Sequence, residues 1–376
     1  MPKVSVIVPN YNHARFLPER LESVLGQTRK PDEVILLDDA SGDNSREILR
    51  EYAERYPDLI TCHFNKENSG SPFIQWAKGL ELAHGEFIWI AESDDVADPG
   101  FLETLVPMLD ADPKVGIAYC QSYEIDADGK NLGDRHYWTD VLDAERWKSA
   151  YTNDGRDECV RYLSWRNTIP NASGVLFRKD AYCHVTDMPQ TFKLSGDWLV
   201  WLSLLKKHDI SYTPRILNFF RVHGGTVRKA TREEKARSES WCVRQYILDD
   251  IASSTADKSV ILSQQLNVIG QSVSALGSSP QPHLVIEDYD QRLSELFAEL
   301  SERQRREYTK NKNAYLPLAK RLADYGNKFY TTENYKLARQ YYTASLNYDP
   351  YSWRVIVHVA STYFPVLRKL ANKFAG

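Results

Sequence analysis

The spacing of apolar residues changes near residue 230 of the chain. Before that point, short apolar runs alternate with stretches in which apolar residues recur at helical spacing. The runs are Val4–Val8, Val34–Leu37, Ile60–Phe64 and Phe87–Ala91, and the stretches between them are Phe16–Leu25, Ser45–Tyr56 and Phe73–Ala83. Strands that are apolar on both faces and alternate with helices are typical of a mostly parallel sheet covered by helices. The sequence therefore predicts an α/β domain over residues 1–228.

Beyond residue 230, strand patterns nearly vanish and helical spacing dominates. We expect an all-α domain over residues 229–376, with helices at 231–252, 257–276, 288–308 and 314–330. Within this domain, a set of residues has the spacing of one tetratricopeptide-like unit at about 319–352, namely Leu322, Gly326, Phe329, Ala338, Tyr342 and Pro350. A single repeat cannot bury its own apolar face, so the unit is expected to stack on neighbouring helices.

Composition and charge narrow the class of protein. A length of 376 residues suits two domains, and 47 Lys and Arg against 51 Asp and Glu give a net charge of −4, which gives no reason to expect nucleic acid as a partner. The five cysteines are odd in number and never form a Cys-x-x-Cys pair, which argues against a disulfide framework or a zinc site and for a reducing cytoplasm. No apolar run is long enough to span a bilayer, and the first residues lack the pattern of a signal peptide.

The last stretch of the chain, Tyr363–Phe374, is basic and amphipathic. Such a helix can lie on an anionic membrane surface. A capping helix of the all-α domain is the favoured interpretation. Peripheral contact with the inner face of the cell membrane is the alternative, within an otherwise cytoplasmic location.

Polar segments follow three of the predicted strands: Pro9–His13, Asp38–Asp43 and Glu92–Asp95. Because parallel sheets bind ligands at the carboxyl ends of their strands, these segments are expected to meet at one rim. The carboxylates of Glu92, Asp94 and Asp95 would repel one another unless a cation lay among them, and oxygen ligands suit Mg²⁺ or Mn²⁺. A helix-capping turn is the alternative interpretation of this acidic segment.

Several enzyme classes lack their motifs in this chain. No Gly-x-Gly-x-x-Gly follows the first strand, and neither a P-loop nor a Gly-x-Ser-x-Gly elbow occurs anywhere. Dinucleotide-binding, P-loop and α/β-hydrolase folds are therefore disfavoured, because each needs that turn to place a phosphate or a nucleophile. A nucleotidyltransferase is disfavoured as well, since the first strand–helix turn is not a Gly-rich basic loop.

Residues 3–110 resemble the nucleotide-sugar-binding half of the family 2 glycosyltransferases, which have the GT-A fold. The motifs that carry this resemblance, in order, are Val4–Asn12, Leu21–Thr28, Glu33–Asp43, Asn68–Gly70, Ala83–Ile88 and Glu92–Asp95. The resemblance implies a catalytic domain over residues 1–228. Its first half, residues 1–112, would bind the nucleotide-sugar, and its second half, residues 113–228, would bind the acceptor.

The resemblance also implies roles for the residues that match these motifs. In the first half, Tyr11 would stack on the nucleobase, Pro9 would shape that pocket, and Asn12 belongs to the same opening motif. Asp39 would accept a hydrogen bond from the ring N–H of uracil or thymine. Lys78 stands where members place a residue near the pyrophosphate, and a solvated helix lysine is the alternative.

The acidic segment matches the Asp-x-Asp-type motif of the family. Asp95 is the favoured metal ligand, and Asp94 is expected near the ribose or the metal. Glu92 stands where many members have Asp, so it is assigned to the donor site without a direct metal contact. The implied cofactor is Mn²⁺ or Mg²⁺.

In the second half, Asp197 at the start of the segment Gly196–Trp201 is the expected catalytic base. An inverting transfer needs one carboxylate to take the proton of the acceptor hydroxyl. A helix N-cap is the alternative role for Asp197, and Trp198 is expected either against the acceptor sugar or in the core. Arg221 and His223 follow a predicted strand, where Arg221 could neutralise phosphate charge and His223 could complete the metal shell.

The expected function is an inverting, metal-dependent transfer of a sugar from a nucleotide diphosphate donor to a glycan or lipid-linked acceptor. A UDP-sugar is favoured over a dTDP-sugar, and the context expected is bacterial cell-surface polysaccharide such as O-antigen or capsule. The alternative is a non-catalytic scaffold on a GT-A frame. In either case the helical domain offers a surface for a protein partner or a homo-oligomer.

Overall fold

The computed structural model describes residues 3–182, 192–224 and 233–254, together with parts of 257–264 and 323–363. The expected helix at 288–308, most of those at 257–276 and 314–330, and the basic stretch from residue 364 onward lie outside the described residues. Leu322 and Pro350 also lie outside them. The tetratricopeptide-like unit therefore stays a prediction.

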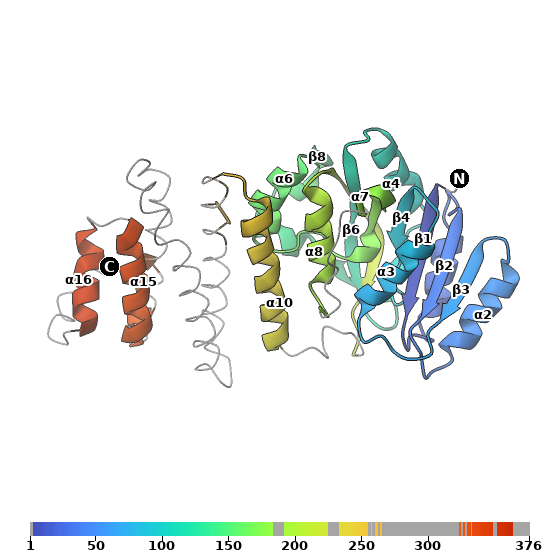
Figure 1. Cartoon of the computed structure of the whole chain (residues 1–376), viewed down its shortest axis with the longest axis horizontal. Coiled ribbons are helices and arrows are strands. Elements are labelled where there is room, and N and C mark those ends of the chain that lie inside the picture. The colour runs from blue at the N-terminus through green and yellow to red at the C-terminus, as the bar shows by residue number, and fades with distance from the viewer. Residues whose placement is uncertain are drawn as a thin grey trace. The chain divides into compact units, whose positions relative to one another are not determined.

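Four parallel strands form the half of the sheet that the sequence predicts most directly. They are β1 (Val4–Asn10), β2 (Glu33–Asp38), β3 (Ile60–Phe64) and β4 (Phe87–Ile90). Their order in the sheet is β3-β2-β1-β4 (Figure 1). The chain therefore adds β2 and β3 on one side of β1 and then returns to add β4 on the other side. All seven residues of β1 are buried, because helices cover both faces of the sheet.

The sheet continues with strands from the second half of the domain. β9 (Val175–Arg178) is antiparallel to both β4 and β6 (Val115–Ile125), and β10 (Asp209–Arg221) runs parallel to β6. Short antiparallel strands complete the ten strands of the described sheet: β5 (Val96–Ala97), β7 (Asn131–Asp134) and β8 (Tyr151–Asn153). The predicted α/β fold is confirmed.

The alternation of side chains along β1 divides the helices into two layers. Val4, Val6 and Val8 lie in one apolar cluster with α1 (Leu17–Leu25), α2 (Ser45–Arg55) and α4 (Phe101–Asp110). Ile7 points to the other face, where α3 (Pro72–Leu82) approaches so closely that a Cβ on Gly79 would lie 2.4 Å from Ile7. Burial on both faces accounts for the unbroken apolar runs of the sequence.

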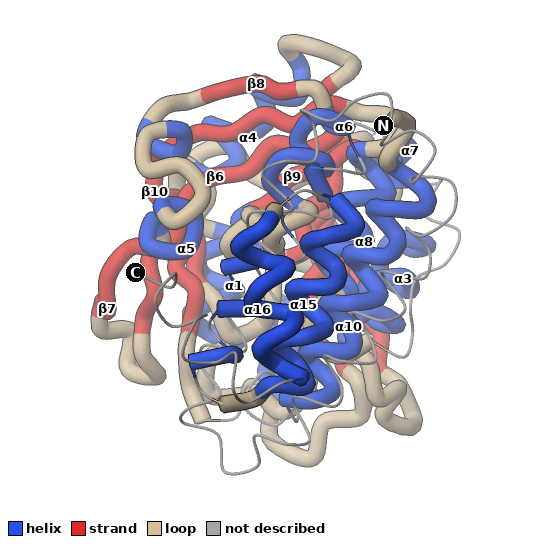
Figure 2. Tube along the Cα trace, turned by 90° about the vertical axis from the view of Figure 1, so that its left-hand side faces the viewer, coloured by secondary structure: helices blue, strands red, loops and turns tan. Residues whose placement is uncertain are grey.

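Helix α8 (Gly196–Leu205) covers the same face as α3, farther along the sheet (Figures 1 and 2). The ring of Trp201 packs against Trp76 of α3 and Phe177 of β9, with ring centroids 6.1 and 5.9 Å away. The other described helices of this unit are α5 (His136–Asp140), α6 (Gly155–Glu158), α7 (Lys179–Tyr182) and α10 (Glu233–Tyr246), with π-turns at Cys159–Leu163 and Ile247–Ile251.

The chain divides into two compact units, Met1–Ile251 and Ala252–Gly376. The first unit therefore extends past residue 228, where the sequence analysis placed the domain boundary. The reason is packing: the Arg244 guanidinium of α10 donates to the Trp165 carbonyl at 2.7 Å, and Arg156 donates to the carbonyl of Ile251. Helix α10 thus belongs with the α/β fold rather than with the helical part.

Two helices are described in the second unit, α15 (Tyr335–Tyr348) and α16 (Trp353–Tyr363). The Arg339 guanidinium of α15 donates to the Thr362 hydroxyl and carbonyl of α16, both at 3.1 Å. Gly326 lies so close to the Tyr342 ring that a Cβ would come within 2.4 Å of it. The described helices of this unit therefore pack on one another.

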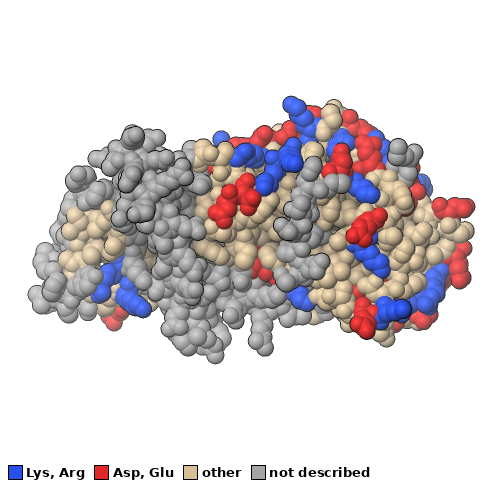
Figure 3. Space-filling view, in the orientation of Figure 1, with Lys and Arg blue, Asp and Glu red and all other residues tan. Residues whose placement is uncertain are grey.

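The described surface carries both signs of charge. Figure 3 shows acidic and basic side chains interspersed on the visible face of the first unit. Within the described part of the chain, no helix is long and apolar enough to cross a membrane. Cys62, Cys120, Cys159 and Cys242 are free thiols.

Candidate active site

A cavity of about 570 Å³ lies at the carboxyl ends of β1, β2 and β4. Residues from both halves of the α/β fold line it. The predicted site residues among them are Pro9, Tyr11, Asp39, Glu92, Asp94, Asp197 and Arg221. Strand ends that are far apart in sequence meet here because the parallel strands share one edge of the sheet.

Tyr11 and Asn12 have different places at this rim. Tyr11 lines the cavity with 48% of its side chain exposed, as a ring free to take a flat ligand would be. Asn12 has a positive φ of 57° and turns its side chain the other way, where Oδ1 accepts from the Gly42 amide at 2.8 Å. Asn12 is absent from the cavity lining and instead joins the loop after β1 to the loop after β2.

The Asp39 carboxylate is held by donors from the segment between β3 and α3 and from α3 itself. Oδ1 accepts from Asn65 at 2.7 Å, the Ser69 amide at 2.9 Å and Gln75 at 2.8 Å, and Oδ2 accepts from the Ser69 hydroxyl at 2.7 Å. A carboxylate oxygen has two lone pairs. Oδ2 therefore retains an acceptor position at the wall of the cavity.

Lys78 lies outside the cavity. Its Nζ donates to Asn65 Oδ1 at 2.7 Å, and Asn65 in turn donates to Asp39. This placement does not support the pyrophosphate contact expected for Lys78. Because α3 directs the Lys78 side chain toward the segment that holds Asp39, Lys78 contacts Asp39 only through Asn65.

The three carboxylates after β4 have different surroundings. Glu92 lines the cavity and accepts from the Trp76 indole N–H at 2.8 Å. Burial, followed by the negative charge of Asp94, raises the pKa of Glu92 to about 8. Asp95 is 1% exposed and its oxygens accept from the Ser173 hydroxyl at 2.6 Å and the Arg221 amide at 2.8 Å. Burial and the Asp94 charge also raise the pKa of Asp95.

A group of candidate metal ligands forms around Asp94 rather than Asp95. One ligand atom each of His13, Asp94 and His223 lies within 4.8 Å of the other two. His223 Nε2 is 3.0 Å from Asp94 Oδ2, and the Ser93 hydroxyl is 2.8 Å from His13 Nδ1. Burial raises the pKa of the Asp94 carboxyl, but the hydrogen bond from His223 and the two imidazoles outweigh it and leave the pKa lowered.

A buried arginine backs this acidic cluster. Arg20 is fully buried, and its Nε donates to the Glu92 carbonyl at 2.8 Å. Burial lowers the pKa of the Arg20 guanidinium to about 10, against the opposing effect of Asp95, Asp94 and Glu92. A fixed positive charge behind three carboxylates reduces their mutual repulsion.

The guanidinium of Arg221 is committed to the protein. Nε donates to the Asp94 carbonyl at 2.7 Å, and Nη2 pairs with Glu19 at 2.5 Å. The side chain is 1% exposed. The phosphate contact expected for Arg221 is not supported by this arrangement, since the guanidinium instead fixes the backbone of Asp94.

Asp197 enters the cavity from the first turn of α8. Asn167 Nδ2 donates to Asp197 Oδ2 at 3.0 Å, and the Trp138 indole donates to the Asn167 carbonyl at 2.7 Å. A Cβ on Gly196 would lie 2.5 Å from the Phe73 ring, so only glycine lets α8 begin this close to α3. Trp198 is 4% exposed and lies outside the cavity, which places it in the core.

His13, Asn167 and Trp138 were not assigned as site residues from the sequence. His13 had a sequence signal, because it ends the polar segment that follows β1. Asn167 and Trp138 had none, since their spacing to Asp197 carries no pattern. Only the tertiary structure brings His13 and Trp138 to the same cavity and places Asn167 between Trp138 and Asp197.

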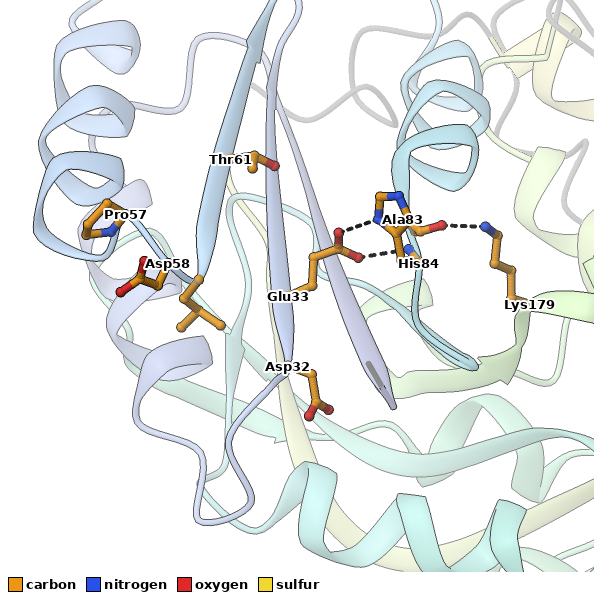
Figure 4. Close-up of a pocket in the computed structure, with 9 residues that line it drawn as sticks. Asp32, Glu33, Pro57, Asp58, Thr61, Ala83, His84 and Lys179 are labelled. Atoms are coloured by element: carbon orange, nitrogen blue, oxygen red, sulfur yellow. Dashed lines mark hydrogen bonds and ion pairs between the residues drawn. The ribbon is translucent and has the colours of Figure 1, made fainter. Parts of the chain in front are cut away.

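A second cavity, of about 860 Å³, lies at the amino ends of β2 and β3, at the opposite edge of the sheet (Figure 4). Glu33 accepts here from the His84 amide at 2.9 Å and lies 2.8 Å from the His84 ring. Lys179 donates to the Ala83 carbonyl in the same view. These contacts tie the start of β2 to the turn after α3.

The chain is similar to known proteins in sequence and in fold. The sequence model of glycosyl transferase family 2 matches residues 5–184. The putative teichuronic acid biosynthesis glycosyltransferase TuaG of Bacillus subtilis is 38% identical over 247 residues, which are 65% of this chain and 88% of that protein. An uncharacterized glycosyltransferase of Nostoc is 28% identical over 255 residues, 66% of this chain and 75% of the relative.

A solved structure shares the fold. TarS residues 1–349 of S. aureus, in complex with UDP-GlcNAc, match with a TM-score of 0.58 and 16% identity over 96% of this chain and 91% of that one. This likeness shows a GT-A fold. With the identity to TuaG and the family match, it leads to one conclusion: the chain belongs to glycosyl transferase family 2.

Proposed function

We propose that this glycosyltransferase is inverting and metal-dependent, and that it moves a sugar from a UDP-sugar to a saccharide acceptor of a bacterial cell-surface polysaccharide. One observation carries the proposal. A single cavity is lined by Tyr11, Asp39, His13, Asp94 and Asp197, and His223 lies beside Asp94. These are the parts needed to hold a nucleotide, a diphosphate and an attacking hydroxyl. No scaffold function requires all of them together.

Tyr11 and Asp39 form the proposed nucleobase pocket. The exposed Tyr11 ring offers a stacking surface, and Asp39 Oδ2 offers an acceptor for the ring N–H of uracil. Thymine presents the same N–H, so a dTDP-sugar is the second choice. Solved complexes of TarS with UDP and with UDP-GlcNAc support the uridine donor.

The group His13, Asp94 and His223 fits a divalent cation. Two imidazoles and one carboxylate, with ligand atoms within 4.8 Å of one another, suit Mn²⁺ better than Mg²⁺, which prefers oxygen alone. When bound, the ion would stabilise the negative charge of the departing diphosphate. Ser93 orients His13, and Arg221 fixes the backbone of Asp94. We therefore assign the third metal ligand to His13 instead of Asp95.

Asp197 is the proposed catalytic base. Asn167 donates to one carboxylate oxygen and the Trp198 amide donates to the other at 2.7 Å, so the carboxylate is held in a fixed position at the wall of the cavity. The carboxylate takes the proton of the acceptor hydroxyl while that oxygen attacks the anomeric carbon from the face opposite the nucleotide. The bond from the anomeric carbon to the diphosphate breaks, and the configuration at that carbon is inverted.

An aromatic wall beside Asp197 is the proposed acceptor site. Tyr137, Trp138 and Phe220 line the cavity, and Trp138 is linked to Asp197 through Asn167. Aromatic rings present flat apolar faces against which the C–H face of a sugar can pack. The name of the relative TuaG supports a polysaccharide acceptor of the cell surface. The sugar of a glycan and that of a lipid-linked saccharide can both pack against this wall.

Nucleotide-sugar binding gives the first test. Thermal unfolding is measured with UDP-, dTDP- and GDP-sugars, each with and without Mn²⁺, because a ligand that binds the native state raises its apparent stability. We expect UDP-sugars with Mn²⁺ to give the largest shift. A larger shift with GDP-sugars, or shifts that do not depend on Mn²⁺, would contradict the proposal.

Loss of the base gives the second test. Asp197→Asn should lower kcat by about 10²- to 10⁴-fold, because the amide cannot take a proton, while the affinity for UDP stays unchanged. Turnover is followed as UDP release, and UDP binding by calorimetry. Equal turnover in the variant would remove Asp197 from the mechanism.

A further inference from the structure

Helix α10 contributes a buried carboxylate to the rear of the active site. Glu239 is 4% exposed and accepts from three consecutive backbone amides, those of Lys193 at 2.7 Å, Leu194 at 2.8 Å and Ser195 at 3.0 Å. Three N–H groups aimed at one side chain are an unusual concentration of charge-assisted hydrogen bonds. The residues that donate these bonds lead into α8.

Glu239 anchors the chain at the point where that helix begins. Ser195 is the N-cap residue of α8, but its side chain makes no capping hydrogen bond. The amides at a helix start lack intrahelical partners, and a negative charge there is favourable. Glu239 supplies that charge from a different helix, and it accepts from the amide of the N-cap residue and from the two amides before it. Asp197 lies in the first turn, two residues after this N-cap.

The segment Phe192–Ser195 also contacts the donor side of the cavity. The Phe192 carbonyl accepts from the Ser71 hydroxyl at 3.2 Å, and Lys193 Nζ donates to the Gly70 carbonyl. Gly70 and Ser71 directly follow Ser69, whose amide and hydroxyl bind Asp39. One short segment therefore touches both the loop that holds the nucleobase acceptor and the helix that carries the base.

We propose that Glu239 is a positioning residue for Asp197. By holding the segment Phe192–Ser195, it sets the place of the Asp197 carboxylate relative to the donor. The consequence for turnover rests on the proposed function, whereas the anchoring of the segment does not. A misplacement of about 1 Å in such a site can cost about 10²-fold in rate.

Kinetics of the full-length chain test the catalytic part of this proposal. Hydrolysis of UDP-GlcNAc with Mn²⁺ and no saccharide acceptor is measured for wild type, Glu239→Ala and Glu239→Gln. We expect Glu239→Ala to lower kcat by about 10- to 100-fold with little change in donor KM. The kcat of Glu239→Gln should lie between those of wild type and Glu239→Ala, because its amide oxygen keeps part of the hydrogen bonding. A raised donor KM with kcat unchanged would overturn the proposal.

A double variant separates positioning from general destabilisation. If Glu239 acts through Asp197, Glu239→Ala should cause no further loss in an Asp197→Asn background, because coupled residues are not additive. An equal loss in both backgrounds would overturn the proposal. Asp250→Ala is the matched control, since Asp250 pairs with Lys206 next to the far end of α8 at 3.4 Å. It should leave turnover unchanged.

Hydrogen exchange tests the anchoring without any substrate. Glu239→Ala should speed exchange of the amides of residues 193–199 and leave those of α4 unchanged. Unchanged exchange of the amides at 193–199 would overturn the proposal. This outcome does not depend on which nucleotide-sugar the enzyme uses. If wild type does not hydrolyse UDP-GlcNAc while the exchange result holds, the failure falls on the proposed function and the anchoring of the segment stands.

Discussion

Asp94 and Asp95 are neighbours in the sequence but have different hydrogen-bond partners. Asp94 lies beside His223 at 3.0 Å, whereas both oxygens of Asp95 accept hydrogen bonds from the protein. Burial and the charge of Asp94 raise the pKa of Asp95. At the scale of single residues, one carboxylate is directed to the proposed metal and the other holds Ser173 and the backbone of Arg221.

This difference predicts unlike effects of substitution. His13→Gln should weaken Mn²⁺ binding by at least about 10-fold, because a ligand or its support is lost. Asp95→Asn should leave Mn²⁺ affinity within a small factor and lower the free energy of unfolding instead. Free Mn²⁺ is titrated by electron paramagnetic resonance in the presence of UDP. Loss of Mn²⁺ binding in Asp95→Asn, with none in His13→Gln, would restore Asp95 as the ligand.

At the scale of elements, the site depends on how closely α8 approaches α3. The junction is the contact between Gly196 and the Phe73 ring, where a Cβ would come to 2.5 Å. Phe73 lines the cavity, so the same contact shapes its wall. The helix start that carries Asp197 is thus set by packing as well as by hydrogen bonds.

Gly196→Ala should destabilise the fold by about 1–3 kcal/mol, as overpacking of a closed contact does. Urea unfolding of the full-length chain measures the change. Phe73→Leu combined with Gly196→Ala should recover part of the loss, because the smaller side chain leaves room for the methyl group. An additive loss in the double variant would show that the contact is not the cause.

The pairing of Glu33 with the turn after α3 gives the fold a dependence on pH. Burial raises the pKa of Glu33, but hydrogen bonds from Ser5 and His84 outweigh it, so the pKa falls below its ordinary value of 4.5. The stabilisation is therefore present above that value and is lost as the pH falls through the lower, folded-state pKa.

Glu33→Gln should lower the free energy of unfolding by about 1 kcal/mol at pH 7. The difference from wild type should shrink as the pH is lowered past the ordinary pKa of a glutamate, because the wild-type carboxylate then takes up a proton. Urea unfolding at a series of pH values checks this. A difference that grows on acidification would contradict the assigned direction.

At the scale of the whole molecule, the chain consists of two compact units. The cavity belongs to the first unit, and the packing of Gly326 on Tyr342 belongs to the second. The tetratricopeptide-like unit, the membrane contact of the last stretch and a partner surface on the helical part stay predictions.

Calorimetry of the full-length chain should show two unfolding transitions. UDP with Mn²⁺ should stabilise one of the two units, by about 2.7 kcal/mol at about 100 times Kd, because the proposed nucleotide site lies in the first unit. Gly326→Val should destabilise the other unit, since the new side chain would overlap the Tyr342 ring. A single transition that responds both to the ligand and to Gly326→Val would contradict separate unfolding of the two units.

The sequence by itself determined the four parallel strands, the helices between them and the rim on which Tyr11, Asp39 and Asp94 meet. Local periodicity and the chemistry of strand ends are enough for that, because both are properties of short segments. The contacts of Lys78, Asp95 and Arg221 were decided only by the tertiary structure, which surrounds each with partners distant in the chain. The same holds for His13, Asn167 and Glu239. A side chain contributes to chemistry or to support according to which donors and acceptors reach it, and that is fixed by packing rather than by spacing.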